Sequence, residues 1–294
     1  MNSAGPIVVG FDGSDVAGRA VTWAAHAAEA QGAQLLVVNA ADRMRYIPDA
    51  SVGFWTPDLA QEAATKVAER GVELAREVAP DVEVTQNVSL SSPALTLEEL
   101  SADARQIVVG NTGHGRIAGI LLGSTAFHVA THAQCPVTVI PSGPCPQPGP
   151  EHRVSVASDG SPSATRAVKH AANIAGRRNA PLEILTVWEF PYFGGQGMPV
   201  GGYMSMEQAA EKSTEWATKF AEDAKREALQ EQPGLTVTTQ VLEGRPQDVL
   251  ADASADAAML VVGARGRGDL RSLLLGSTSR ALLHHAKCAV EIVR

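Results

Sequence analysis

The sequence predicts an α/β protein built from two tandem open-sheet domains, each a five-stranded parallel sheet with helices on both faces. Three observations lead to this prediction. A glycine pattern occurs twice, short apolar segments alternate with segments of helical periodicity in each half, and a proline-rich stretch lies between the halves. The 294 residues are enough for two domains of ordinary size, each with its own core.

The repeated pattern consists of GxxG, nine further residues and then Gly-Ser-Thr. Its two copies are Gly110, Gly113, Gly123, Ser124 and Thr125, and then Gly263, Gly266, Gly276, Ser277 and Thr278. The copies are 263 − 110 = 153 residues apart and have the same internal spacing, which indicates one module written twice. The Asp-Gly-Ser sequence also repeats, at Asp12 and Asp159, with an offset of 159 − 12 = 147. The difference predicts a six-residue insertion, placed at Phe190–Tyr203.

In the first half, apolar segments alternate with amphipathic ones, as expected for strands and helices that succeed each other along the chain. The predicted strands are Ile7–Phe11, Leu35–Asn39, Val82–Val88, Ile107–Val109 and Val137–Ile140. The predicted helices run from Ser14 to about Gln31, from about Leu59 to Val78, from about Pro93 to Asp103 and from Ser124 to about His132. This alternation favours a parallel sheet covered on both faces.

The second half repeats this order. Its predicted strands are Val154–Ser158, Leu182–Val187, Leu235–Val241, Met259–Val262 and Ala289–Val293. Ser14 and Ser161 are suitable N-caps for the first helix of each half, and Gly32 and Gly176 suit the ends of those helices.

The apolar pattern of each strand also indicates its place in the sheet. Ile107–Val109 is continuously apolar, which is typical of a central strand, whereas Val82–Thr85 and Leu235–Thr238 alternate, which is typical of an edge. The last strand also alternates at Val290–Ile292. We therefore expect an exposed edge there, through which the two halves, or two chains, could pair.

Residues 142–150 contain a run of prolines that can continue neither a helix nor a central strand. We interpret this segment as a semi-rigid linker. The predicted domains are therefore residues 1–141, called the first half below, and residues 151–294, called the second half.

Composition excludes several classes of partner. The formal net charge of −8 argues against a broad nucleic-acid footprint, and no apolar run approaches the ~20 residues that a membrane span needs. Since the start of the chain also lacks the pattern of a signal peptide, we expect a cytoplasmic protein with no nucleic-acid or membrane partner. The three cysteines form no CxxC pair, and we interpret them as reduced thiols.

The glycines follow the fourth strand of each half, where ligands of open α/β sheets bind. Residues without a Cβ allow the backbone to come close to a phosphate group. The Gly-Ser-Thr sequence then precedes a helix, whose first amide groups can hold an anion. An isolated GxxG is more often a simple turn, and Asp12 and Asp159 can also act as helix caps, but two copies in one frame favour a binding site.

A first strand that ends in Asp-Gly-Ser, the glycine pattern, a short helix and a Cys-Pro-Val strand together resemble the universal stress protein family. The resemblance covers residues 5–141 and 151–294 and suggests the tandem form of that family. It implies the strand order 3-2-1-4-5 in each half and one ATP, with Mg²⁺, at the switch between strands 1 and 4.

Carried onto matching positions, the resemblance implies two sets of ATP-binding residues. In the first half they are Gly10, Phe11, Asp12, Ala40, Val109, Gly110, Gly113, His114, Gly115, Gly123, Ser124 and Thr125. In the second half they are Ala157, Ser158, Asp159, Val187, Val262, Gly263, Gly266, Arg267, Gly268, Gly276, Ser277 and Thr278. His114 and Arg267 can also reach phosphates as charged donors.

No catalytic constellation or metal-ligand set emerges from the sequence, so we expect a nucleotide-binding stress or signalling regulator with at most weak ATPase or autophosphorylation activity. One alternative is an enzyme of the adenine nucleotide α-hydrolase type, although the SGGxDS loop typical of that group is replaced by Asp-Gly-Ser. A second is an interaction module that has lost nucleotide binding. A homodimer is also compatible with the sequence.

Overall fold

The computed structural model describes residues 5–41, 57–113, 122–189, 206–267 and 274–294. The chain folds into two compact units, one of residues 1–147 with 283–294 and one of residues 148–282. Each unit is treated separately below. The insertion expected at Phe190–Tyr203 lies outside the described residues.

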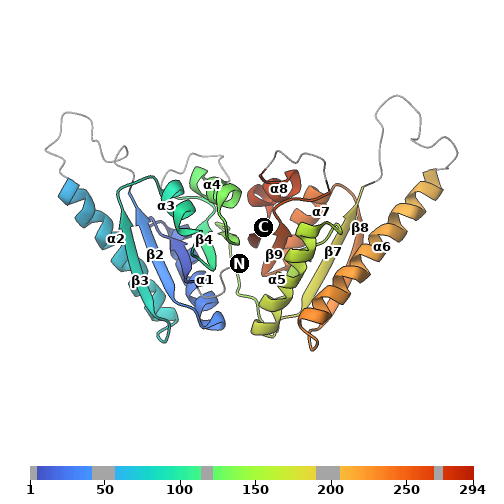
Figure 1. Cartoon of the computed structure of the whole chain (residues 1–294), viewed down its shortest axis with the longest axis horizontal. Coiled ribbons are helices and arrows are strands. Elements are labelled where there is room, and N and C mark those ends of the chain that lie inside the picture. The colour runs from blue at the N-terminus through green and yellow to red at the C-terminus, as the bar shows by residue number, and fades with distance from the viewer. Residues whose placement is uncertain (1–4, 42–56, 114–121, 190–205, 268–273) are drawn as a thin grey trace, which may run out of the picture. The chain divides into compact units, whose positions relative to one another are not determined.

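The first half has the alternation of strands and helices that the sequence predicts (Figure 1). Its strands are β1 (Ile7–Gly10), β2 (Leu35–Ala40), β3 (Val84–Ser89), β4 (Gln106–Gly110) and β5 (Val137–Ile140). Its helices are α1 (Asp15–Gln31), α2 (Pro57–Val78), α3 (Pro93–Leu100) and α4 (Ser124–His132).

These five strands are parallel and lie in the order β3-β2-β1-β4-β5, which confirms the predicted 3-2-1-4-5 arrangement. The order reverses between β1 and β4, and ligands of open α/β sheets bind beyond the carboxyl ends of the strands at such a point. The first unit also includes β10 (Ala289–Val293), which pairs with β5 in the antiparallel sense, with Val290 opposite Val139 and Ile292 opposite Val137.

The second half repeats the arrangement. It contains β6 (Val154–Ala157), α5 (Pro162–Arg178), β7 (Leu182–Trp188), α6 (Met206–Glu231), β8 (Val237–Glu243), α7 (Pro246–Ala253), a 3₁₀ turn (Ser254–Asp256), β9 (Met259–Gly263) and α8 (Ser277–His285). Strands β8-β7-β6-β9 are parallel neighbours in that order, which again places the first and fourth strands of the half side by side.

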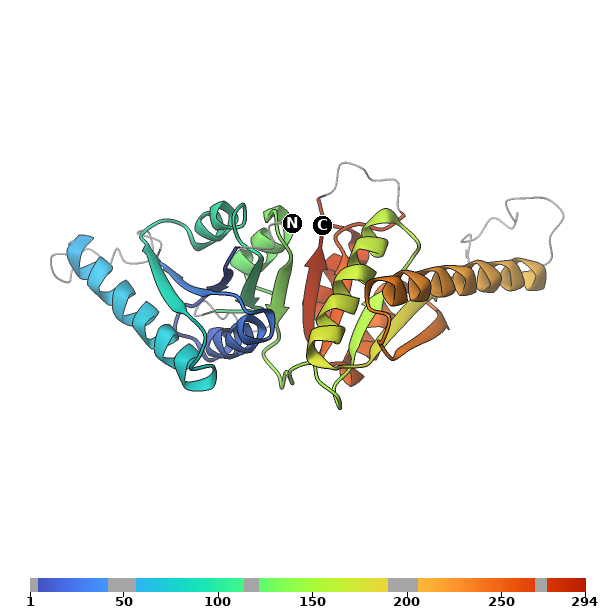
Figure 2. The same ribbon diagram turned by 60° about the horizontal axis from the view of Figure 1, so that its bottom comes forward.

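Helices cover both faces of each sheet, as Figure 2 shows separately for each half. In the first half α1 packs on α2, while α3 packs on α4. This division follows from right-handed crossovers, because the chain winds outward from β1 to β3 and then returns to β4 across the other face.

Two details of the sequence prediction are wrong. Helix α5 does not end at Gly176 but at Arg178, and its C-cap is Asn179, which adopts the left-handed conformation with φ of 51°. Asparagine is the residue besides glycine that tolerates this conformation best, and Asn179 matches Gly32, the C-cap of α1. The edge predicted at the last strand pairs with β5, but the alternating face of that strand is not exposed, because Glu291 is fully buried within β10.

The core of the first half includes a tight contact between the end of β1 and helix α2. The Phe11 ring follows β1 and is only 3% exposed. A Cβ on Gly71 of α2 would lie 2.7 Å from Phe11 Cδ1 and 2.8 Å from Val37 Cγ1. Helix α2 therefore needs glycine at this position because the aromatic ring occupies the space.

We expect Gly71→Ala to destabilise the protein by about 1–3 kcal/mol, because the added methyl group overfills this contact. Gly18→Ala is the matched control, since a Cβ on this other helical glycine would lie 3.9 Å from its nearest neighbour, Leu74 Cδ1. The control should stabilise helix α1 by about 0.5–1 kcal/mol. Urea unfolding of both variants measures the difference, and equal stabilities would contradict the packing argument.

All three cysteines are free thiols. Burial raises the pKa of Cys135 to about 12 and the pKa of Cys145, in the linker, to about 11, both above the ordinary value of 9.0. The folded protein therefore keeps these thiols protonated at a pH where the unfolded chain ionises them.

We expect native Cys135 and Cys145 to react with iodoacetamide at pH 8 far more slowly than in urea, because the thiolate is the nucleophile. The stability that these thiols contribute should be fully present below the unfolded-state pKa and decrease as the pH rises above it. Mass spectrometry of timed samples gives the labelling rates. Equal rates in native and unfolded protein would refute the raised pKa values of buried Cys135 and half-buried Cys145.

Candidate functional site

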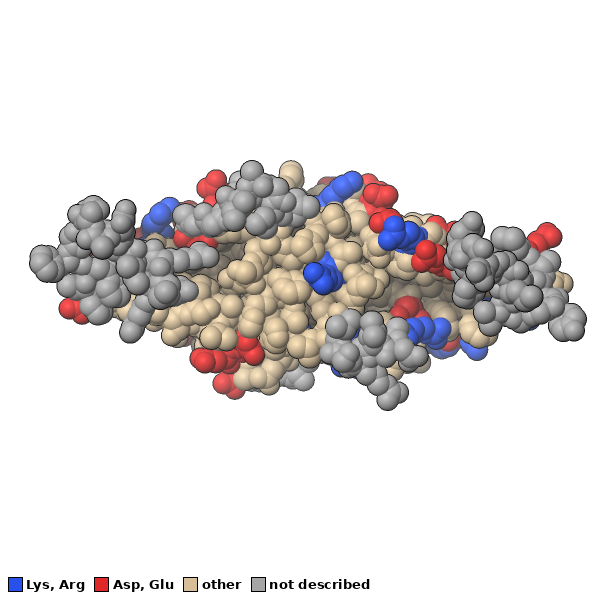
Figure 3. All heavy atoms as spheres, turned by 90° about the horizontal axis from the view of Figure 1, so that it is seen from above, with Lys and Arg blue, Asp and Glu red and all other residues tan. Residues whose placement is uncertain are grey.

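The predicted site residues lie at the carboxyl ends of the central strands in each half. Figure 3 views this side of the molecule, on which described Lys, Arg, Asp and Glu side chains are all visible.

The turn between the first strand and the first helix has the same geometry in both halves. Gly13 and Gly160 have φ of 86° and 74°, a conformation that favours glycine. The next residue is the N-cap, and the hydroxyl of Ser14 accepts from the Ala17 amide at 3.3 Å. Asp12 Oδ1 in turn accepts from the Ser14 amide at 3.0 Å.

The second oxygen of this carboxylate faces the glycine loop. A Cβ on Gly113 would lie 2.3 Å from Asp12 Oδ2, so a side chain there would require the carboxylate to move. In the second half a Cβ on Gly266 would lie 2.6 Å from Asp159 Oδ2. In both halves the aspartate after the first strand therefore lies against the loop that follows the fourth strand.

Asp159 shows this role most completely. Its Oδ1 accepts from the Ser161 amide and its Oδ2 from the Arg267 amide, both at 2.9 Å. Sequence reasoning left helix capping and ligand contact open for Asp159, and the structure shows it bound to two backbone donors in different segments.

Packing within the protein also explains why residues 110 and 263 are glycine. A Cβ on Gly110 would lie 2.8 Å from Val16 Cγ1, and one on Gly263 would lie 2.6 Å from Ser163 Oγ. These contacts come from the first turns of α1 and α5, so each glycine lets its helix pack closely on the sheet. Room for a phosphate is not needed to explain them.

Gly123 and Gly276 are different. The nearest atoms to an added Cβ would be the Asn111 and Ala264 carbonyl oxygens, both at 3.5 Å, which is ordinary contact. The Gly123 amide donates to the Asn111 carbonyl at 2.7 Å, and the Gly276 amide donates to the Ala264 carbonyl at 2.8 Å. Among the described residues, nothing in the protein requires glycine at either position.

Gly123 is the N-cap of α4, with φ of −74°, and it has no side-chain cap hydrogen bond among the described residues. Ser124 is exposed and Thr125 is half-buried, and the same is true of Ser277 and Thr278 at the start of α8. The first amides of these two helices thus lie beside hydroxyl groups and the positive end of a helix dipole.

Ala40 and Val187 lie at the carboxyl ends of β2 and β7, as predicted. Sequence reasoning missed the residues before them. Asn39 is 6% exposed and donates from Nδ2 to the Phe11 carbonyl at 2.7 Å, while its Oδ1 has no partner among the described residues. The equivalent Thr186 is 2% exposed, and its Oγ1 likewise has none within the described part of the chain.

Phe11 itself reaches the site only through its backbone, because its ring is in the core. Ser158 replaces it in the second half. The other predicted residues lie in the last two positions of their strands and are Gly10, Val109, Ala157 and Val262. His114, Gly115 and Gly268 lie outside the described residues.

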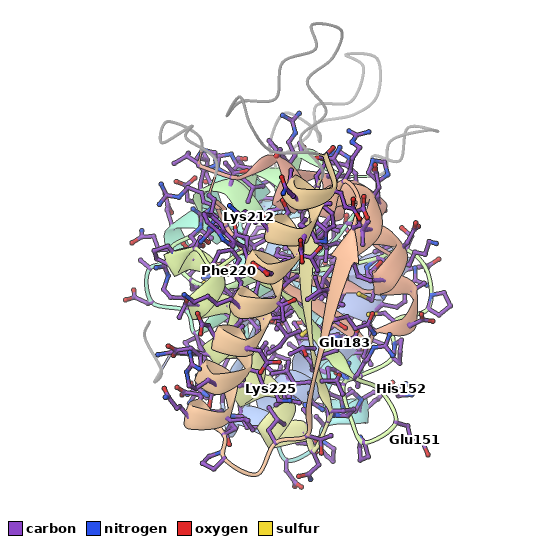
Figure 4. The ribbon with its side chains drawn as sticks, turned by 90° about the vertical axis from the view of Figure 1, so that its right-hand side faces the viewer. Glu151, His152, Glu183, Lys212, Phe220 and Lys225 are labelled. Atoms are coloured by element: carbon purple, nitrogen blue, oxygen red, sulfur yellow. The ribbon has the colours of Figure 1, made fainter. Side chains whose placement is uncertain are left out.

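The side chain of Arg267 makes a contact that the sequence did not reveal. Its guanidinium carbon lies 3.9 Å from the centre of the Phe220 ring on α6, which is a cation–π contact. Figure 4 labels Phe220 along this helix. The equivalence of Arg267 and His114 in the two glycine loops was visible in the sequence, but the partner on α6 was not.

The described residues contain no group of three or more His, Cys, Asp or Glu side chains arranged to hold a metal ion. Within the same ranges, no helix is both long and apolar enough to cross a membrane.

Comparisons with known proteins agree with the fold and the repeat. The model of the universal stress protein family matches residues 4–141 and again residues 151–294. A universal stress protein of Mycobacterium tuberculosis is 32% identical over 306 residues, covering 98% of this chain and 96% of its own. The chain belongs to the universal stress protein family, in its tandem form.

A solved structure shows the same architecture. A universal stress protein from Archaeoglobus fulgidus matches with a TM-score of 0.68 at 19% identity, covering 99% of this chain and 96% of its own. A universal stress protein in complex with cAMP is 27% identical and covers 49% of this chain and 98% of its own, with a TM-score of 0.36. In that structure the bound cAMP belongs to the neighbouring protein and not to this chain.

We expect Asp159→Ala to destabilise the second half by about 1–3 kcal/mol, because two backbone amides lose a charged acceptor. Asp159→Asn is the control, since its single carbonyl oxygen can keep one of the two bonds, and its loss should be smaller. Urea unfolding measures both variants, and hydrogen exchange should locate the loosened amides at Ser161 and Arg267. An alanine variant as stable as the unchanged protein would disprove the loop-holding role.

Proposed function

We propose that each half binds ATP and that the protein acts as a nucleotide-dependent stress or signalling regulator with little or no turnover. The observation that carries this proposal is the glycine at the start of α4 and α8. Gly123 and Gly276 stand where a side chain would fit the protein, yet each leaves a helix N-terminus open beside serine and threonine hydroxyls. The triphosphate is the part of ATP that such a helix start attracts.

The opposite end of the crevice offers an acceptor for the base. Asn39 Oδ1 is buried, has no partner among the described residues, and precedes Ala40 at the end of β2. An adenine amino group is a donor that would satisfy this oxygen, whose burial without a partner costs about 1–3 kcal/mol. Thr186 Oγ1 would take the same part in the second half.

The low rate of ATP hydrolysis in this proposal follows from the hydrogen bonds that the two aspartates already accept. Both oxygens of Asp159 already accept backbone hydrogen bonds, and Asp12 uses Oδ1 in the same way. A general base must be able to take a proton from the attacking water, and a carboxylate engaged by two amides is poorly suited to do so. Binding that changes conformation or association is therefore the proposed output. Any Mg²⁺ would be held chiefly by the phosphates.

The remaining parts of the proposal concern assembly and location. The antiparallel ladder between β5 and β10, the last strands of the two halves, supports their pairing within one chain. A homodimer and a cytoplasmic location remain predictions from the sequence.

The test is to purify the protein without added nucleotide, denature it and identify what is released by chromatography and mass spectrometry. We expect ATP, approaching one molecule per half. AMP together with pyrophosphate release on incubation with ATP would instead indicate the α-hydrolase type of enzyme. Release of no nucleotide, and no binding of added ATP, would leave an interaction module and overturn the proposal.

We expect the double variant Gly123→Glu, Gly276→Glu to lose ATP binding in both halves. Each added carboxylate would stand where the phosphates are proposed to lie and would repel them. It should leave the fold intact, because a Cβ fits at both positions and an acidic group is favourable at a helix N-terminus.

Gly143→Glu in the linker is the matched control for each single variant, since nothing lies within 4 Å of a Cβ there and it adds one carboxylate, as each of them does. Equilibrium dialysis with ATP measures the stoichiometry, and circular dichroism checks the fold. Unchanged stoichiometry in a folded double variant would rule out this phosphate position, whereas the single variants show which half is occupied.

A further inference from the structure

A buried polar side chain near the carboxyl end of the second strand differs between the two halves. It is Asn39 in β2 and Thr186 in β7, which are equivalent because Asn39 lies opposite Val88 and Thr186 opposite Val241 in the next strand. Asn39 is 6% exposed and Thr186 is 2% exposed. Asn39 Oδ1 and Thr186 Oγ1 each have no hydrogen-bond partner among the described residues. A buried oxygen in this state is costly until a ligand group satisfies it.

The amide of Asn39 can present only its oxygen to a ligand. Its Nδ2 donates to the Phe11 carbonyl at 2.7 Å, and a carbonyl accepts hydrogen bonds but donates none. Turning the amide over would set two oxygens against each other, so this contact determines where Oδ1 lies. The Phe11 amide in turn donates to the Val38 carbonyl, which places the contact at the carboxyl ends of β1 and β2. The first half therefore offers a buried acceptor that cannot donate.

The hydroxyl of Thr186 is less restricted. Its hydrogen rotates, so the same oxygen accepts from a donor or donates to an acceptor. Within the described part of the chain, no hydrogen bond to Ser158, the equivalent of Phe11, fixes its direction. Ser158 lines a polar cavity of about 310 Å³, whereas the Phe11 ring is packed in the core. The second half therefore offers a group that adapts to its ligand.

Purine bases differ in the hydrogen bond that their 6-substituent makes. Adenine has an amino group there, which donates, whereas hypoxanthine and guanine have an oxygen, which accepts. For a base in the same position, Asn39 Oδ1 would bind the amino group and repel the oxygen, because two acceptors would then face each other. Thr186 Oγ1 would accept from the amino group and would donate to the oxygen.

We propose that the two halves select different purine nucleotides. The first half binds 6-amino purines and rejects 6-oxo purines, with Asn39 as the residue that determines specificity, and the second half binds both classes through Thr186. This inference rests on the proposed function, because it requires the base to lie at the ends of β2 and β7. It extends that function by giving each half its own range of ligands.

The test compares ATP with ITP, the triphosphate of hypoxanthine, on full-length single variants after bound nucleotide has been removed. Gly276→Glu leaves the first half to bind, and Gly123→Glu leaves the second. Isothermal titration calorimetry of Gly276→Glu should give a Kd for ITP at least about tenfold above the Kd for ATP. For Gly123→Glu the two Kd values should agree within about threefold.

The possible outcomes separate this inference from the proposed function. Equal discrimination against ITP in both halves, or none in either, would overturn the inference and leave ATP binding in place. No binding of ATP by the unmodified chain would overturn both. A first half that rejects ITP beside a second half that accepts it is the result that supports the assignment.

Exchanging the two residues tests their role directly. Asn39→Thr in the Gly276→Glu chain should bring the Kd values for ITP and ATP within about threefold of each other. Thr186→Asn in the Gly123→Glu chain should separate them by at least about tenfold, because the carbonyl of Ser158 is available to orient the new amide. Original ratios in both folded exchange variants would show that other residues select the base.

Thr186→Val keeps the shape of threonine and serves if the exchange variants do not fold. In the Gly123→Glu chain it should weaken binding of both ATP and ITP by about fivefold or more. Its urea midpoint should be equal or higher, because an unsatisfied buried hydroxyl is removed. Unchanged binding of both nucleotides would refute a contact between Thr186 and the base.

Thr138→Val in the same Gly123→Glu chain is the matched control. Thr138 is also a fully buried strand threonine, but its Oγ1 accepts from Gln106 Nε2 at 2.7 Å. This change should lower the urea midpoint, because Gln106 loses its acceptor, and it should leave the Kd values for ATP and ITP unchanged. Opposite effects of the two valine substitutions on stability and on binding would distinguish a ligand-binding hydroxyl from a structural one.

Discussion

The carboxylate that follows the first strand is the contact on which each site depends. Asp159 binds the amide of Ser161, two residues on, and the amide of Arg267, 108 residues on. One side chain thereby fixes both the turn that begins α5 and the loop that follows β9. Because of the close approach of that loop, a Cβ at position 266 would displace the Asp159 carboxylate from its contact. The geometry of the crevice thus rests on a short-range electrostatic contact rather than on the apolar core.

The repeat made the fold predictable from the sequence, because a strand and helix order that occurs twice with one spacing leaves few alternatives. The purpose of each glycine was not predictable. Gly110 is needed because Val16 lies against it, and Gly113 because Asp12 does, and both neighbours are far away along the chain. The buried state of Glu291 escaped prediction for the same reason, since an alternating strand indicates an exposed face only when nothing packs on it.

The two halves share the same backbone fold, but different side chains pack within it. The turn geometry at Gly13 and Gly160 is nearly the same, as is the capping by Ser14 and Ser161. Side chains beneath the turn have diverged, since a buried ring in one half corresponds to a serine and a polar cavity in the other. The shared backbone argues for one common ligand class, whereas the altered filling argues for a property that only the second half has.

The atoms that lie nearest to an added Cβ distinguish two kinds of glycine in this chain. Some glycines are explained by packing within the protein, and others are explained by a proposed ligand. At Gly110, Gly113, Gly263 and Gly266 the Cβ would collide with the protein itself, so these residues would be glycine even in a chain that binds nothing. At Gly123 and Gly276 it would meet only ordinary contacts, at 3.5 Å or more, and a serine or aspartate there would cap the helix better than glycine does. A helix start that forgoes this stabilisation in both halves is the reason for proposing that an anion takes the place of the capping side chain.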